Sequence, residues 1–118
     1  VFEITTGHRA NEPENSCVTF SYDKNKDGVV SQAQGEFFGY RLHDNAIEYR
    51  VAGNSCIQSG WYDLTDTQTT VATKFMVNRR HSSSWGSAYE IEIELHSKVD
   101  PTVKSARTFI VEAVNAYY

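Results

Sequence analysis

The sequence predicts a mainly β fold, an antiparallel β-sandwich or β-barrel with at most one short helix. Its composition suits strands, because the 118 residues include 7 Tyr, 6 Phe and 2 Trp, with prominent Val and Thr. Several segments alternate apolar and polar side chains, as half-buried strands do. Clusters of turn-forming residues separate these segments roughly every 8–15 residues, which is typical of antiparallel sandwiches and barrels. The length suits a single domain, placed at residues 1–118.

Five alternating segments each support one strand. In chain order they read FEITT (2–6), CVTFSY (17–22), AIEYRV (46–51), TVATKFMV (70–77) and AYEIEIEL (88–95). The last is the clearest, because its tyrosine, isoleucines and leucine fall on one face and its glutamates on the other. A strand with this period buries one face and leaves the other in water.

Two further segments fit a helix or a strand. Residues 30–42 have apolar side chains at helical spacing, but they also fit a strand with a bulge at Gly35. Residues 101–118 follow Asp100 and begin with Pro101, a pair typical of a helix start. Their RTFIVEAV portion fits a closing strand equally well, so the period leaves both alternatives open.

A calcium loop is the first metal site that the sequence suggests, at residues 23–34 (DKNKDGVVSQAQ). Gln34 stands where such a loop needs a bidentate carboxylate, and Lys24 and Lys26 cancel the local negative charge. The preceding residues alternate as a strand, whereas the loop requires a helix. The segment is therefore interpreted as a hairpin turn, and the four scattered histidines suggest no zinc site. The sequence predicts no metal and no cofactor.

Charge and hydropathy argue against nucleic acid and membrane as partners. A net charge of -4 lacks the basic surplus of nucleic-acid binders, and there is no run of about 18 apolar residues that could span a membrane. The two cysteines, Cys17 and Cys56, are expected to form a disulfide, with two free buried thiols as the alternative. A disulfide favours a secreted, extracellular protein, and the start at Val1 is what a processed chain would have.

The best candidate for binding is the segment NRRHSSSWGS, residues 78–87, predicted as a polar hairpin tip. It gathers Arg79, Arg80, His81 and Trp85 in an otherwise acidic protein. Arginine and tryptophan often dominate the binding energy of interfaces. The alternative is a solvated loop whose tryptophan folds back on the sheet.

The order of several short motifs resembles the family of the major Alternaria allergen and related small secreted fungal proteins. The matching pieces are FEIT, a cysteine just before VTFSY, a second cysteine in SCIQSGWYDL, TVATKFMV and AYEIEIEL. The chain departs from the family where relatives carry a further cysteine, at Asp63 and Leu64. The resemblance implies an allergen-like fungal effector or elicitor that acts in plant immunity and virulence. Its partner would be a plant host protein, with a thaumatin-like defence protein as one candidate, and a homodimer is open.

An enzyme is the rival hypothesis. The segment AQGEFFGYRLHD (33–44) resembles the helix region of small fungal guanyl-specific ribonucleases. Asp63, Lys74 and His96 then follow in the order of that family's catalytic carboxylate, cation and histidine. The family's Tyr-x-His pair has no match, since the chain reads EYRV there, so this site would be degraded or silent. The sequence therefore predicts a binding protein that is not an enzyme.

Overall fold

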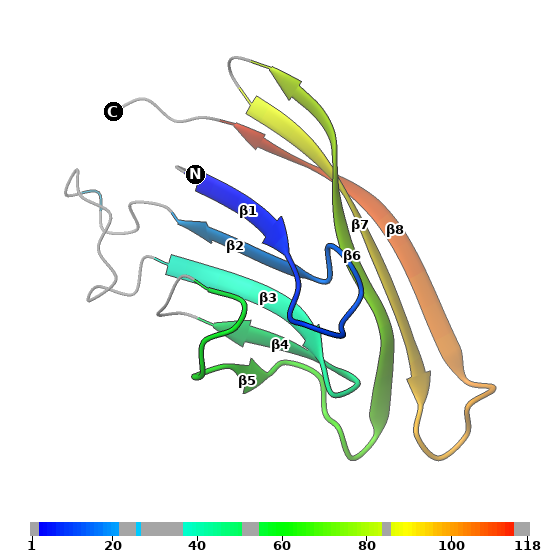
Figure 1. Ribbon diagram of the computed structural model, residues 1–118. Helices are drawn as coiled ribbons and strands as arrows, with labels where there is room; N and C mark the ends of the chain where they lie inside the picture. Colours follow the sequence, from blue (N-terminus) through cyan, green and yellow to red (C-terminus); the bar gives the residue numbers. More distant parts are fainter. Residues whose placement is uncertain (1–2, 22–25, 27–36, 51–54, 84–85, 115–118) are drawn as a thin grey trace.

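The computed structural model describes residues 3–21, 26, 37–50, 55–83 and 86–114 (Figure 1). These ranges form eight strands and no helix. The strands are β1 (Glu3–Gly7), β2 (Cys17–Ser21), β3 (Phe37–His43), β4 (Ala46–Arg50), β5 (Tyr62–Asp63), β6 (Thr70–Ser83), β7 (Gly86–Ser97) and β8 (Lys104–Val114). Accordingly, no described segment has the helical length and hydropathy of a membrane span.

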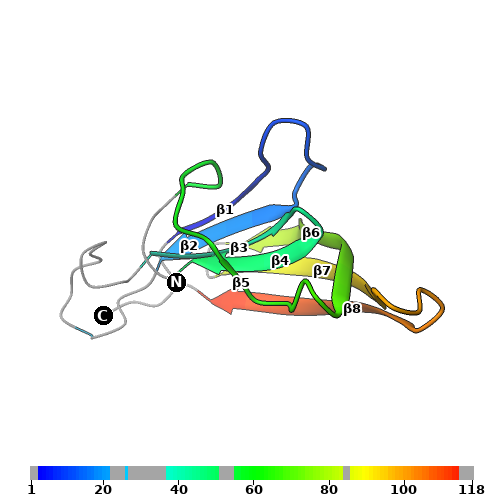
Figure 2. The same ribbon diagram turned by 90° about the horizontal axis from the view of Figure 1, so that it is seen from below.

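The strands form two antiparallel sheets. One is five-stranded in the order β1-β2-β3-β4-β5, and the other is three-stranded in the order β6-β7-β8. Figure 2 shows β1 and β2 of the first sheet above β7 and β8 of the second. The prediction of a mainly β fold is confirmed in its sandwich form. Strand pairing in the described residues does not close the sheets into a barrel.

The two ambiguous segments are strands wherever the structure describes them. Phe37–His43 pairs with β2 on one side and β4 on the other, and Lys104–Val114 pairs along β7. The apparent helix start is instead a turn, in which the Asp100 carboxylate accepts hydrogen bonds from Thr102 Oγ1 at 2.7 Å and Thr102 N at 3.1 Å. Aspartate caps turns by the same chemistry that it uses at helix starts. Residues 30–36 and 115–118 lie outside the described ranges, as does the predicted calcium or turn segment except Lys26.

Backbone hydrogen bonds join the edge of β6 to two loop residues of the five-stranded sheet, Asn15 and Asn45. Asp44 and Asn45 both have positive φ, 50° and 61°, as a two-residue β-hairpin between β3 and β4 requires. The Asn45 carbonyl accepts a hydrogen bond from Ala72 N at 2.8 Å, and the carbonyl of Asn15 accepts one from Val77 N at 2.9 Å. These bonds use the backbone groups of β6 that point away from β7.

The core lies between the sheets. Its buried side chains are Val18, Ile47, Ala72, Phe75, Val77 and Tyr89, with Ile4, Leu42, Ile91, Ile93 and Leu95 packed partly buried against them. The apolar face that the alternation assigns to residues 88–95 is therefore the core-facing one. Period 2 identifies it because the opposite face of the strand is in water.

Residues 55–61, which precede β5, pack against the outer face of the five-stranded sheet. Cys56 in this segment forms a disulfide with Cys17 of β2, with their Cα atoms 6.2 Å apart. Arg41 on β3 pairs with buried Glu48 at 2.7 Å, donates to the Cys56 carbonyl at 2.8 Å and lies over the Trp61 ring at 4.6 Å. The disulfide, the buried ion pair and the tryptophan thus hold one covering segment in place.

Candidate binding cleft

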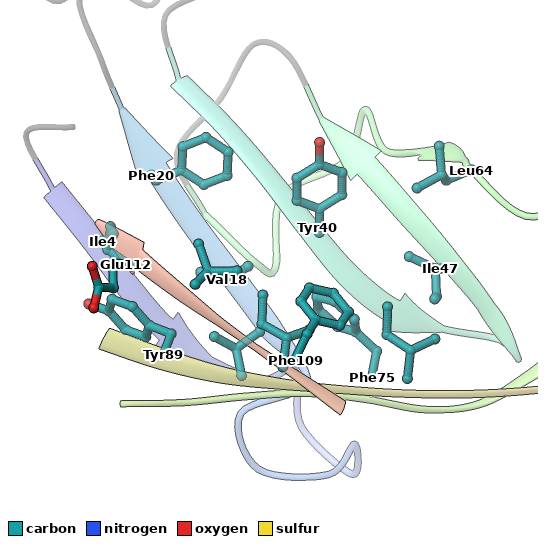
Figure 3. A pocket seen from close by; sticks show the side chains of 14 residues that line it. Ile4, Val18, Phe20, Tyr40, Ile47, Leu64, Phe75, Tyr89, Phe109 and Glu112 are labelled. Atoms are coloured by element: carbon teal, nitrogen blue, oxygen red, sulfur yellow. The ribbon is translucent and has the colours of Figure 1, made fainter. Parts of the chain in front are cut away.

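An apolar cleft of about 420 Å³ lies between the two sheets (Figure 3). Its lining comes from both layers. The residues are Ile4, Val18, Phe20, Tyr40, Ile47, Leu64, Phe75, Val77, Tyr89, Ile91, Ile93, Phe109, Val111 and Glu112. This volume falls in the range of sites that bind small molecules or side chains of a partner.

Strand register brings these side chains together. Val18 pairs with Tyr40 across β2 and β3, so both project from the same face of the five-stranded sheet. On the opposite sheet Ile91 pairs with Phe109, so the final strand extends the apolar face of β7. Figure 3 shows Tyr40 and Phe109 on opposite sides of the gap.

The cleft exists because the sheets diverge. β6 is the strand of its sheet whose backbone lies closest to β2, β3 and β4, so β7 and β8 stand farther from the first sheet. In a sandwich with parallel layers the inner side chains interdigitate and fill the space. Here several lining side chains stay partly in water, with Phe109 44% exposed, Val111 41% and Leu64 57%.

The cleft is lined mainly by apolar and aromatic side chains. Two lining aromatic rings stack on one wall, with the centres of Phe20 and Tyr40 6.2 Å apart. Glu112 is the single carboxylate among the lining residues. Apolar walls are stabilised when another apolar surface removes them from water.

The predicted hairpin tip at 78–87 is mostly paired strand, so the loop prediction is wrong there. Arg79 pairs with Tyr89 and its guanidinium lies 5.9 Å from that ring, while His81 pairs with Ala88. The Arg80 side chain forms an ion pair with Glu90 at 3.2 Å. Polar side chains on both faces of a strand give the same pattern as a loop, which explains the error. Trp85 lies outside the described residues.

The ribonuclease hypothesis fails on secondary structure and placement. The described part of its supposed helix, residues 37–44, is β3 and the start of a turn. Asp63 lies in β5 of one sheet, whereas Lys74 lies in β6 of the other and pairs with Glu92 at 3.1 Å. His96 Nδ1 contacts the carbonyl of Ser97 at 2.9 Å. The residues thus form no shared site. Within the described ranges, no group of three or more His, Cys, Asp or Glu side chains could hold a metal ion either.

Sequence reasoning missed the cleft. The available signal was the apolar run Phe109 to Val111 in a tail that could have been helix or strand. The sequence alone shows neither the register that sets Phe109 beside Ile91 nor how the two sheets stack.

Comparison with known proteins identifies relatives in bacteria. The family model described as prepilin peptidase-dependent protein B matches residues 2–113. The protein of that name from Escherichia coli is 22% identical over 105 residues, covering 86% of this chain and 56% of its own length. An uncharacterized protein from Haemophilus influenzae is 24% identical over 140 residues, with the same coverage of 86% and 56%. The chain thus spans about half the length of these curated relatives. No solved structure matches.

These matches overturn the resemblance to the fungal allergen family. The predicted roles as an allergen-like effector, elicitor or virulence factor in plant immunity are therefore wrong. The predicted plant host partner, with the thaumatin-like protein as a candidate, is wrong for the same reason. The fungal resemblance rested on short alternating strands, one cysteine pair and a tryptophan, features that any small disulfide-bonded β domain can share. The family model instead matches nearly the whole chain. This chain belongs to the prepilin peptidase-dependent protein B family.

Proposed function

We propose that this chain is the folded domain of a non-catalytic subunit in a bacterial type IV pilus-related assembly, in a protein matured by prepilin peptidase. The observation that carries the proposal is the family match over residues 2–113, which spans β1 to β7 and all of β8 except Val114. The matching E. coli protein is named for its dependence on that peptidase. The relatives extend well beyond the matched region, so the subunit would combine this sandwich with further chain.

The cleft supports a role in assembly. Subunits hold together by removing apolar surface from water, and contiguous exposed apolar patches on a folded domain mark such contacts. Phe109, Val111 and Leu64 present partly exposed side chains around a gap that is already shaped. In the proposal, an apolar segment of a neighbouring subunit enters the cleft between the sheets.

The disulfide supports a location outside the cytoplasm. Bonds such as Cys17–Cys56 form and persist in oxidising compartments and are rare in the bacterial cytosol. An exported subunit would meet such conditions before it assembles.

Peptidase dependence is tested on the full-length protein that contains this chain. Expressed in its own bacterium with active prepilin peptidase, the protein should have a lower mass than in a strain with an inactive peptidase, measured by intact-mass spectrometry after membrane extraction. An identical mass in both strains would refute maturation by this enzyme.

The assembly role is tested by deletion and complementation, with surface pili sheared from the cells and quantified. Deletion should reduce them, and the unchanged protein should restore them. Leu64→Asp should restore them poorly, because it puts a carboxylate into the cleft, whereas Ile57→Asp should restore them fully. Ile57 is the matched control, since its side chain is 71% exposed and lies outside the cleft. Equal complementation by both variants would show that the cleft is not needed for assembly.

A further inference from the structure

We propose that strand β8 pairs antiparallel with β8 of a second copy of this chain, with Lys104 of each copy opposite Glu112 of the other. The pairing would join the two three-stranded sheets into one continuous sheet. It rests on the edge of β8 and on its charges, and it does not depend on the proposed function.

The outer edge of β8 is long and regular. The strand has 11 residues, and its register with β7 runs unbroken from Gly86 opposite Val114 to His96 opposite Lys104. The neighbouring pair β6–β7, by contrast, has two register shifts. Among the described strands β8 pairs with β7 alone. A long, unbulged edge offers a template for another strand.

The backbone groups free for pairing belong to even-numbered residues. Ser97 N donates to the Val103 carbonyl at 2.8 Å, in line with the β7–β8 register. Hydrogen-bonded and non-hydrogen-bonded positions alternate in an antiparallel ladder. Odd-numbered residues of β8 therefore bond β7, and Lys104, Thr108, Glu112 and the even-numbered residues between them direct their N–H and C=O groups outward.

The side chains of this edge are in water. Every residue from Lys104 to Glu112 is exposed, including Phe109, Val111 and Ile110, the last of which is 55% exposed. Proteins usually protect such an edge with charges, proline or bulges along the strand. On β8 the charged residues are Lys104, Arg107 and Glu112, and the three apolar residues lie together between Arg107 and Glu112.

Charge selects the register of the pairing. A two-fold axis perpendicular to the joined sheet relates the two copies of β8 and keeps their core-facing sides on the same face of that sheet. Residues that lie directly opposite each other then point to the same face, so even-numbered residues lie opposite even-numbered residues. An axis through Thr108 sets Lys104 opposite Glu112 twice, once at each end of the paired segment. The same axis sets Arg107 opposite Phe109, a cation beside an aromatic ring. Opposite charges in directly paired positions are stabilising.

Neighbouring registers lack these pairs. An axis through Arg107 sets two like charges directly opposite each other, which is destabilising. Axes through Phe109 or Ile110 move Lys104 away from Glu112 and leave both charges without a partner. The sequence of β8 thus favours self-pairing about Thr108.

Single cysteines test the register in the 118-residue chain. In the proposed dimer the two copies of residue 108 have Cα atoms about 5.5 Å apart, within reach of a disulfide. The two copies of residue 105 lie roughly 20 Å apart along the strands. Mild oxidation should therefore link Thr108→Cys into a covalent dimer and leave Ser105→Cys monomeric on non-reducing gels. No dimer from Thr108→Cys, an equal yield from Ser105→Cys, or faster linkage of Phe109→Cys would overturn the proposed register.

Charge reversal tests the pairing without a cross-link. Lys104→Glu and Glu112→Lys should each weaken dimerisation about tenfold or more, because each replaces two attractive pairs with two repulsive ones. The double variant restores both pairs and should recover the original dissociation constant, measured by sedimentation equilibrium with folding checked by circular dichroism. A double variant as weak as the single ones would overturn the proposal, as would a wild-type chain that stays monomeric up to about 1 mM.

Discussion

At the scale of single residues, Gly39 shows a glycine required by packing. A Cβ atom at this position would lie 2.7 Å from Trp61 Cη2 and 3.1 Å from the Val18 carbonyl oxygen. The backbone oxygen belongs to the paired strand β2 and cannot move without breaking the ladder. The tryptophan can therefore cover the sheet closely only because residue 39 has no side chain.

Gly39→Ala is expected to lower the free energy of unfolding by about 1–3 kcal/mol, the usual cost of overpacking. Gly7→Ala is the matched control on the same sheet, because its Cβ would only contact Cys56 Sγ at 4.0 Å. Urea unfolding should show the control within about 0.5 kcal/mol of the original chain. Equal losses from both variants would show that the close contact with Trp61 is not the cause.

Asp100 gives a prediction about pH. Hydrogen bonds from the Thr102 hydroxyl and the Thr102 N–H hold the pKa of its carboxyl below the ordinary value. Because the Asp100 pKa is lower in the folded state, its ionised carboxylate stabilises the fold at pH values above the unfolded-state pKa. This stabilisation is lost as the pH falls through the folded-state pKa. Thr102→Val removes the hydroxyl and should raise the Asp100 pKa toward its ordinary value in a carbon-13 NMR titration. An unchanged pKa in that variant would contradict the assignment of the cause.

At the scale of elements, the sequence predicts strands well where one face meets water. Residues 88–95 alternate because their two faces have different surroundings, and they lie in β7. Residues 46–50 also alternate and lie in β4, although Glu48 on the polar face is buried in an ion pair with Arg41. The same rule fails for 78–83, where β6 continues with polar side chains on both faces. Local period cannot decide 37–43 and 104–114, because pairing with strands elsewhere in the chain makes them strands. The Asp100–Pro101 signal is local, and a turn uses it as readily as a helix.

At the scale of the whole molecule, the central feature is a sandwich that is closed along β6 and open toward β8. Alternation tells which face of each strand is apolar, but it does not tell what covers that face or how far apart two sheets stand. The cleft, and with it the candidate site, therefore could not be predicted from the sequence. The predicted arginine cluster was visible in the sequence, but its described members are paired along β6 and β7. Neither arginine lines the cleft.

The central claim is that the cleft receives an apolar segment of another subunit of the assembly. Site-specific photo-cross-linking in the native bacterium tests it most directly, with benzoylphenylalanine at position 64 of the full-length protein and, as control, at position 57. Position 64 should capture a protein that is itself processed by prepilin peptidase, identified by mass spectrometry, and position 57 should not. If position 64 captured no such protein, or both positions captured the same one equally, the cleft would not be the contact surface.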